Sequence, residues 1–257
     1  MKKLPIGLQV YSIREEAERN FKQAMKEVKD MGYDGVELAG IYGHQPEDIK
    51  DWLNEIGLIP ISAHVPYADL RYELEKTVKT YATIGCSYIA IPYLVEDERY
   101  GTKAYEEFIQ FLPRIAEECT KYDIVLLYHN HDFEFLKTST NEYVLDDLFQ
   151  RLPVQELQAE IDTCWVKASN VDPTQYISQY KGRCPVIHLK DFTGVLPVEF
   201  TAIGQGVQDI KGILDASVAA GAKWIIVEQD SHSTNAPMED TRLSIEFLKA
   251  LDGDRYE

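Results

Sequence analysis

Eight short apolar runs alternate along this chain with longer stretches of helical periodicity. Runs rich in β-branched residues predict buried parallel strands, and amphipathic stretches predict helices that pack over those strands. The strands are predicted at residues 6–12, 35–39, 60–65, 87–93, 124–131, 157–162, 185–191 and 223–230. The helices are predicted at residues 15–31, 46–56, 70–84, 103–121, 142–152, 173–180, 209–220 and 238–251.

Eight strands, each followed by a helix, indicate an α/β protein with a (β/α)8 TIM barrel. The length of 257 residues suits one such barrel, so a single domain is expected over residues 1–257. Four predicted helices end at a glycine, the usual helix stop: Gly32, Gly57, Gly85 and Gly221. A doubly wound open sheet would usually place a glycine-rich turn after its first strand, and QVYSIRE contains no glycine. The barrel is therefore preferred.

The charge of the chain excludes some classes of protein. The sequence has 26 basic and 43 acidic residues, a formal net charge of −17, which argues against nucleic-acid binding. No apolar run is long enough to span a membrane. The four cysteines show no CxxC spacing, and charged residues precede any secretory apolar region, so a cytoplasmic protein with free thiols is expected. The sequence leaves open whether the protein forms a homo-oligomer.

Polar side chains close most of the predicted strands. Active sites of TIM barrels lie at the carboxyl ends of the strands, so these side chains are the candidates for chemistry. They are Gln9, Tyr11, Glu37, His64, His129, His131, Glu134, Glu160, Asp162, His188, Lys190, Glu228 and Asp230.

Asp162, His188 and Glu228 end the sixth, seventh and eighth predicted strands. Adjacent strands lie about 4.8 Å apart, so these three side chains could converge on one ion. Each also has a plainer interpretation: Asp162 as a cap of the turn into TCWV, His188 as an interior imidazole, and Glu228 as the partner of Lys190. Together they favour one divalent metal ion, whose identity among Mn, Co, Fe, Zn and Mg stays open.

The fifth predicted strand carries His129 and His131, which share a face at a spacing of two. One of them would suffice as a metal ligand, and the other could transfer protons or orient a substrate hydroxyl. If the strand ends earlier, His131 would lie on a surface loop. Lys190 could stabilise a negative oxygen of the substrate or pair with Glu228 or Glu160.

Three further features are weaker. His64 closes the third strand and is a substrate contact, a proton carrier or a hydrogen-bonded core residue. The AIGQGVQD stretch has two glycines but no P-loop lysine, so a helix entry capped near Gln208 or Asp209 is preferred over a phosphate cradle. Aromatic residues near strand ends, Trp165 among them, could stack on sugar faces, although most are expected to serve packing.

Four motifs carry a resemblance to a known family: YHNHDFEF (128–135), EIDTCW (160–165), VIHLKDF (186–192) and IIVEQD (225–230). With these motifs the chain resembles the sugar phosphate isomerase/epimerase superfamily of xylose isomerase-like barrels. In ketose 3-epimerases of that superfamily, Glu, Asp, His and Glu from the fifth to eighth strands hold one divalent ion. Asp162, His188 and Glu228 match the last three positions, and YHNH replaces the first glutamate.

That replacement implies a branch that includes inosose dehydratase-like proteins and lyases acting on 3-keto sugars or glycosides. His129 is the expected fourth ligand, with His131 as the alternative. The function expected is a metal-dependent sugar isomerase or epimerase that abstracts an α-proton from a keto sugar, cyclitol or sugar derivative through an enediolate. The alternatives are a dehydratase or lyase, a metal-independent isomerase and a non-catalytic sugar-binding relative. The expected catalytic residues are His131, Glu228, Lys190 and His64, and the expected substrate-binding residues are Glu37, Glu134 and Trp165.

Overall fold

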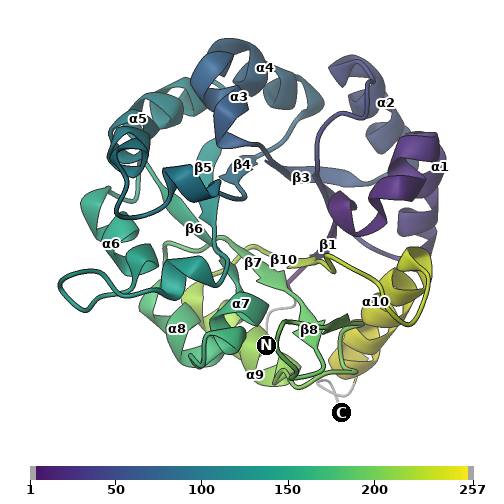
Figure 1. The fold of residues 1–257 in the computed structure, drawn as a ribbon. Helices are drawn as coiled ribbons and strands as arrows, with labels where there is room; N and C mark the ends of the chain where they lie inside the picture. Colours follow the sequence, from purple (N-terminus) through teal and green to yellow (C-terminus); the bar gives the residue numbers. More distant parts are fainter. Residues whose placement is uncertain (1–3, 254–257) are drawn as a thin grey trace.

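The computed structural model describes residues 4–253 and shows a closed barrel of eight parallel strands inside a ring of helices (Figure 1). The predicted TIM barrel is therefore confirmed, whereas the assignment of all residues 1–257 to one domain reaches beyond the described residues and stays a prediction. Around the barrel the strands follow the order β1-β10-β7-β6-β5-β4-β3-β2. They are β1 (Ile6–Gln9), β2 (Gly35–Leu38), β3 (Ile59–His64), β4 (Tyr88–Ile91), β5 (Val125–His129), β6 (Gln158–Asp162), β7 (Val186–Leu189) and β10 (Trp224–Val227).

The helices cover the outer face of the barrel and bury its apolar outward side chains. The four glycines expected as helix stops all adopt positive φ angles, between 81° and 104°, which confirms those ends. The helices are α1 (Arg14–Met31), α2 (Pro46–Ile56), α3 (Tyr67–Tyr72), α4 (Leu74–Ile84), α5 (Lys103–Thr120), α6 (Val144–Arg151), α7 (Thr163–Ala168), α8 (Pro173–Gln179), α9 (Ile210–Ala220) and α10 (Pro237–Gly253).

Several strands end earlier than predicted. β1 stops at Gln9 and passes into a 3-10 helix at Val10–Ile13, and β5 stops at His129. Val10 and Ile13 are buried although they lie outside the sheet. Burial of side chains therefore continues past the last paired residue, and an apolar pattern alone overestimates strand length.

Two helical segments also differ from the prediction. The helix predicted at residues 70–84 is divided into α3 and α4 at Glu73, whose φ and ψ are −131° and 40°. The short helix α7 was not predicted, and it begins directly after β6. Asp162 caps α7 by accepting the backbone N–H groups of Cys164 and Trp165 at 2.8 and 3.2 Å, as the capping interpretation of this residue required.

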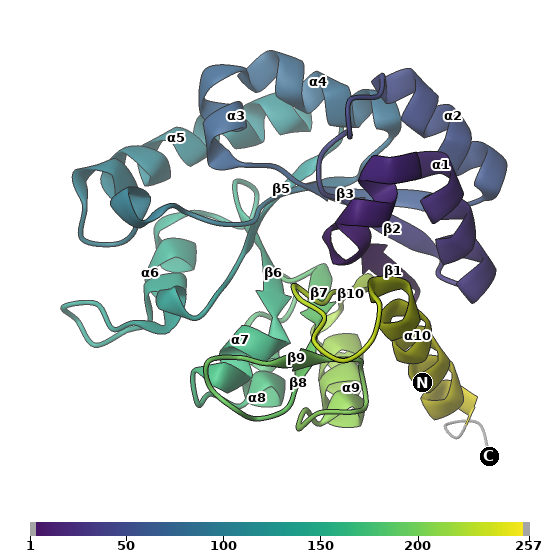
Figure 2. The ribbon, with the colours of Figure 1, turned by 45° about the vertical axis from the view of Figure 1, so that its right-hand side comes forward.

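An antiparallel hairpin that the sequence did not predict follows β7. It consists of β8 (Asp191–Phe192) and β9 (Phe200–Thr201) and lies on the same side of the barrel as α7 and α9 (Figure 2). The carboxylate of Asp191 accepts backbone N–H groups from four residues: Phe192, Gly204, Gly206 and Gln208. The AIGQGVQD turn therefore binds a carboxylate of the chain itself. Asp209 caps α9, which agrees with the helix entry that was preferred over a phosphate cradle.

An apolar layer inside the barrel supports the polar residues. It is formed by Ile61, Ala90, Leu127, Val186 and Ile226. Because side chains of a strand alternate between its faces, each polar residue two positions further along faces the same interior. Leu127, Val186 and Ile226 thus lie two residues before His129, His188 and Glu228, respectively, on the same face of their strands. Within residues 4–253 no helix is both long and apolar enough to cross a membrane.

Candidate metal and active site

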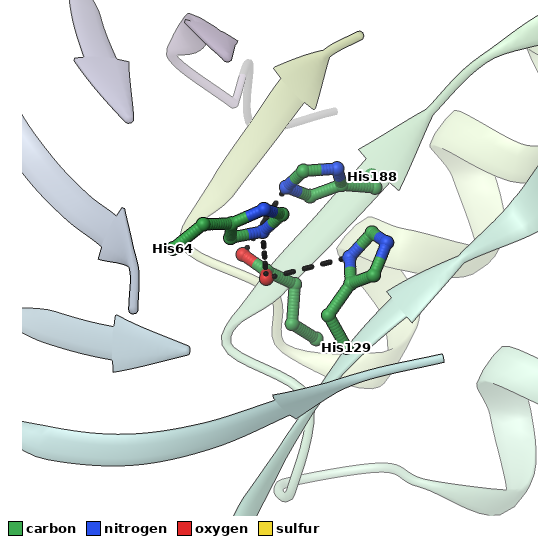
Figure 3. A group of neighbouring side chains, drawn as sticks. His64, His129 and His188 are labelled. Atoms are coloured by element: carbon green, nitrogen blue, oxygen red, sulfur yellow. Dashed lines mark hydrogen bonds and ion pairs between the residues drawn. The ribbon is translucent and has the colours of Figure 1, made fainter. Parts of the chain in front are cut away.

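Glu160 lies at the centre of a buried cluster of imidazoles. Its carboxylate lies 2.9 Å from His64 Nε2, 3.2 Å from His188 Nε2 and 3.5 Å from His129 Nδ1, and Figure 3 shows the three rings directed at one carboxylate. Glu37 joins this cluster from β2, with Oε2 2.6 Å from His188 Nε2 and 3.1 Å from His64 Nε2. Glu160 was a candidate from its place at the end of the strand, but it was given no metal-binding, catalytic or substrate-binding role. Its signal was its position two residues before Asp162, which places both carboxylates on the inner face of β6.

The four predicted metal ligands come together above this cluster. His129, Asp162, His188 and Glu228 are all buried, and each offers a ligand atom within 4.8 Å of the others. His188 Nδ1 lies 2.9 Å from Glu228 Oε2, and His129 Nε2 lies 3.6 Å from Asp162 Oδ2. The pairing of Asp162 with His188 across β6 and β7 brings these residues to one level of the barrel.

The donor set fits a divalent ion. His129 Nδ1, on the Glu160 side of the ring, makes no well-formed hydrogen bond in the described part of the chain, whereas Asp162 Oδ2 is paired with Lys190 Nζ at 3.0 Å. Carboxylate oxygens with imidazole nitrogens are a ligand set for divalent transition metals. His64, His129, Glu160 and His188 also lie within 4.8 Å of one another, so this geometry admits an ion at either of the two adjacent levels.

Lys190 places a buried positive charge beside the predicted ligands. Its Nζ lies 2.8 Å from Glu228 Oε2, 2.8 Å from Asp230 Oδ1 and 3.0 Å from Asp162 Oδ2. Burial alone would lower the pKa of this amine, but the three carboxylates raise it well above its ordinary value. Lys190 is therefore charged. It forms the ion pair with Glu228 that the sequence offered as one interpretation of this lysine.

Burial and neighbouring charges give the cluster residues different protonation states. Burial would raise the pKa of Glu228, yet Lys190 and His188 hold it well below its usual value, so this carboxylate is ionised. Burial and the adjacent His188 hold the pKa of His129 well below its ordinary value, so His129 is neutral. An ionised carboxylate and a neutral imidazole are the forms that bind metal.

His131 lies just outside the sheet, among aromatic rings. Its ring centroid is 5.2 Å from that of His129, 5.4 Å from Trp165 and 5.8 Å from the nearly parallel ring of Phe133. Burial and, next, the charge of Lys190 lower its pKa to about 3. The strand thus ends before His131, but its half-buried ring is next to the cluster and does not lie on a surface loop.

The predicted substrate-binding residues occupy three different positions. Trp165 is half-buried at the start of α7, and its Nε1 makes no hydrogen bond within residues 4–253. Glu37 is fully buried in the lower cluster, where Gln9 and Ser62 also donate to it. Glu134 does not have the substrate-binding position that the sequence predicted. Its two oxygens accept hydrogen bonds from the Tyr128 hydroxyl and the backbone N–H of His131, so the carboxylate is used within the protein and is not presented to a substrate.

A parallel barrel with carboxylates and imidazoles gathered at consecutive strand ends belongs to the large class of TIM-barrel enzymes. Within that class the family is shown by sequence. Residues 25–251 match the family model described as xylose isomerase-like TIM barrel, and the chain belongs to this family.

Known proteins of similar sequence or structure agree with this membership. Inosose dehydratase of Geobacillus kaustophilus is 23% identical, over 89% of this chain and 86% of that protein. A sugar phosphate isomerase/epimerase from Parabacteroides distasonis has a TM-score of 0.83 and 22% identity, over 96% of this chain and 98% of that one. The IolI protein, solved with a bound zinc atom, has a TM-score of 0.75 and 13% identity, over 96% and 98% of the two chains. The resemblance stated from the motifs is confirmed.

Proposed function

We propose that this protein is a divalent-metal-dependent isomerase or epimerase that acts on a keto sugar, a cyclitol or a related sugar derivative. The observation that carries the proposal is the buried group of His129, Asp162, His188 and Glu228, whose ligand atoms lie within 4.8 Å of one another beside Lys190. The similarity to a zinc-containing protein of the same fold supports a metal, with its identity open.

The proposed reaction removes a proton α to a carbonyl and gives an enediolate. A divalent ion held by the four ligands would polarise the carbonyl and make that proton more acidic. Glu228 is ionised, which suits the base that takes the proton. Lys190 is fixed by Asp230 and Asp162 and supplies a positive charge for the negative oxygen.

The remaining residues transfer protons or bind the substrate in this proposal. His131 is neutral and has an Nδ1 without a hydrogen bond in the described chain, so it can exchange a proton with a substrate hydroxyl. Trp165 offers a ring face and a free indole N–H for a sugar. His64, which is held between Glu37 and Glu160, is the proposed proton carrier at the lower level.

A second candidate reaction is dehydration or another β-elimination on an inosose, a 3-keto sugar or a 3-keto glycoside. The observation that favours it is the 23% identity to an inosose dehydratase along most of both chains. Both reactions begin with the same α-proton removal. They differ in whether the proton returns or a β-substituent leaves.

The metal is tested first, by mass spectrometry of the purified protein and by the rise in melting temperature with Mn²⁺ or Co²⁺. We expect about one ion per chain and a stabilisation that grows with metal concentration. Asp162→Asn should abolish both while keeping the fold, because asparagine also caps a helix and α7 needs that cap. Asp172→Asn, at the exposed cap of α8, is the matched control and should bind metal normally. Equal metal content in both variants would contradict the proposed ligand set.

The reaction is tested by incubating the metal-loaded protein in D₂O with 3-keto sugars and inososes. Isomerase or epimerase activity should exchange the α-proton for deuterium and retain all substituents. Dehydratase or lyase activity should release water or an alcohol. Binding without exchange, for every compound that binds, would favour a non-catalytic sugar-binding protein. A cytoplasmic location and a carbohydrate substrate remain predictions, and the oligomeric state stays open.

A further inference from the structure

Glu134 is buried and makes two short hydrogen bonds beside the candidate site. Its Oε2 accepts the backbone N–H of His131 at 2.7 Å, and its Oε1 accepts the hydroxyl of Tyr128 at 2.6 Å. Only 2% of the residue is exposed. Burial of a carboxylate costs free energy, so a buried carboxylate that binds a backbone N–H of the site calls for a functional explanation.

His131 depends on contacts outside the β-sheet for its position. β5 ends at His129, so no strand pairing holds His131 in place. Asn130 is anchored by its side chain, which accepts the N–H of Asp162 at 2.9 Å. The next backbone group along the chain, the N–H of His131, is held by Glu134. The His131 ring then lies between Phe133 and Trp165.

We propose that Glu134 is a positioning residue for His131, which fixes the turn after β5 so that the imidazole faces the metal ligands. This inference deepens the proposed function, since it rests on the proton-transferring role proposed for His131. Tyr128 completes the arrangement from the outward face of β5, because its hydroxyl fixes the second carboxylate oxygen. Glu134 itself touches no reacting atom in this proposal.

The chemistry of the side chain shows which substitution removes the bond to His131. Both partners are donors, and an ionised carboxylate offers an acceptor to each of them. Glutamine is the conservative change, because its carbonyl oxygen can keep the His131 N–H while the Tyr128 hydroxyl turns and accepts from its NH₂ group. Methionine has a similar length but offers no comparable acceptor to either partner, so it is the disruptive change. Aspartate is shorter by one methylene and would not reach both partners.

A small cavity beside Glu134 makes the substitution feasible without collapse of the core. Its volume is about 50 Å³, and its lining includes Arg99, Tyr105 and Tyr128. The Tyr105 hydroxyl has no hydrogen-bond partner within residues 4–253. This space can receive a displaced side chain or a water molecule that replaces the lost acceptor, so Glu134→Met should fold.

The kinetic test compares Glu134→Met, the conservative Glu134→Gln, His131→Ala and the Glu134→Met/His131→Ala double variant in the α-proton exchange reaction. Glu134→Gln should keep most of the activity, whereas we expect Glu134→Met to lower kcat by about tenfold to a hundredfold with little change in KM, as for a misplaced proton-transfer group. In the His131→Ala background the same substitution should have no further effect. A raised KM, or an equal loss in both backgrounds, would mean that Glu134 contacts the substrate and would overturn the proposal.

A second test does not depend on activity. The sequence contains six histidines, and their ¹H–¹³C ring signals can be compared between wild type and Glu134→Met. The signal that is absent from His131→Ala should shift most, while those of the distant His44 and His232 stay in place. Tyr128→Phe, which keeps the bond to the His131 N–H, should shift it less.

An unmoved His131 signal would overturn the positioning role even if the enzyme is active. Conversely, a moved signal in a protein that exchanges no proton would uphold the positioning role and reject the proposed function. The two failures are therefore distinguishable.

Discussion

Lys190 shows how strongly a single residue of this protein depends on its neighbours. It is 1% exposed and contacts three carboxylates, of Asp162, Glu228 and Asp230. A buried charge is tolerated only when it is paired, and removal of one partner leaves the other charges uncompensated. The lysine therefore stabilises the metal-free site, and in the proposed reaction the same charge would stabilise the negative oxygen of the substrate.

Lys190→Met should destabilise the metal-free protein by about 3–5 kcal/mol, because the buried carboxylates of Asp162 and Glu228 and the partly exposed Asp230 lose their cation. Mn²⁺ should recover part of this loss, since a divalent ion can neutralise the same carboxylates. Both effects can be measured by thermal denaturation with and without metal. Lys103→Met is the control: Lys103 pairs with Glu107 on the surface, and its side chain is 92% exposed, so the change should be within about 1 kcal/mol. Equal effects of the two substitutions would contradict this account.

Glu134 should give the protein a measurable pH dependence. Burial raises the pKa of this carboxyl from 4.5 to about 7. Between these pH values the folded protein binds a proton that the unfolded chain has lost, so Glu134 lowers stability as the pH rises. The unfolding free energy of wild type relative to Glu134→Gln should therefore fall by on the order of 2–3 kcal/mol between pH 4.5 and pH 8. Denaturant titrations at both pH values measure these unfolding free energies. A difference between wild type and Glu134→Gln that does not change with pH would show that the pKa of Glu134 is not raised.

Among the elements, one carboxylate links the β8–β9 hairpin to the turn before α9. Asp191 follows Lys190 and binds four backbone N–H groups, three of them in the turn that leads to α9. The side chain of Gln208 also donates to the carbonyl of Lys190. The position of Lys190 is thereby linked to the hairpin and to the turn before α9.

Asp191→Ala should cost about 3 kcal/mol, because one buried and three partly buried N–H groups lose their acceptor at once. Asp172→Ala is matched to it, since Asp172 accepts two N–H groups at the exposed start of α8 and should cost about 1 kcal/mol. Urea denaturation compares the two. We also expect Asp191→Ala to weaken activity through Lys190, while Asp172→Ala leaves it unchanged. A loss no larger than that of Asp172→Ala would show that the hairpin is held by other contacts.

At the scale of the whole molecule, closure of the barrel requires very close approach at two glycines. A Cβ atom at Gly35 would lie 2.5 Å from the backbone oxygen of Ile59 on the neighbouring strand. At Gly7 it would lie 2.4 Å from the end of the Ile61 side chain and 2.7 Å from that of Ile226. The first contact is with backbone that is fixed by strand pairing, and the second is with flexible side-chain ends.

Gly35→Ala should therefore destabilise the protein more than Gly7→Ala, although both add one methyl group to the same barrel. Overpacking typically costs about 1–3 kcal/mol, and we expect Gly35→Ala at or above the upper end of that range. The melting temperatures of the two variants show which substitution destabilises the protein more. A greater loss for Gly7→Ala would mean that the interior side chains are less adaptable than the backbone of β3.

Much of the architecture was predictable from local patterns. The eight strands, the glycine helix stops and the barrel follow from periodicity and chain length, which depend on neighbours in sequence. The strand ends, the division at Glu73 and the β8–β9 hairpin did not follow. They depend on hydrogen bonds such as those of Asp191, whose partners lie up to 17 residues away.

Local sequence was enough to bring carboxylates and imidazoles to the inner strand ends, because alternation along a strand assigns each residue to a face. This predicted that Asp162, His188 and Glu228 would gather with one histidine of the fifth strand, and the resemblance to the family favoured His129 over His131. Only the tertiary structure decided that Glu160 lies at the centre of the imidazoles and that Glu134 binds the backbone of His131. Those positions depend on the stagger of strands around a closed barrel and on competition between buried donors for each carboxylate. Neither is encoded in the residues adjacent to them.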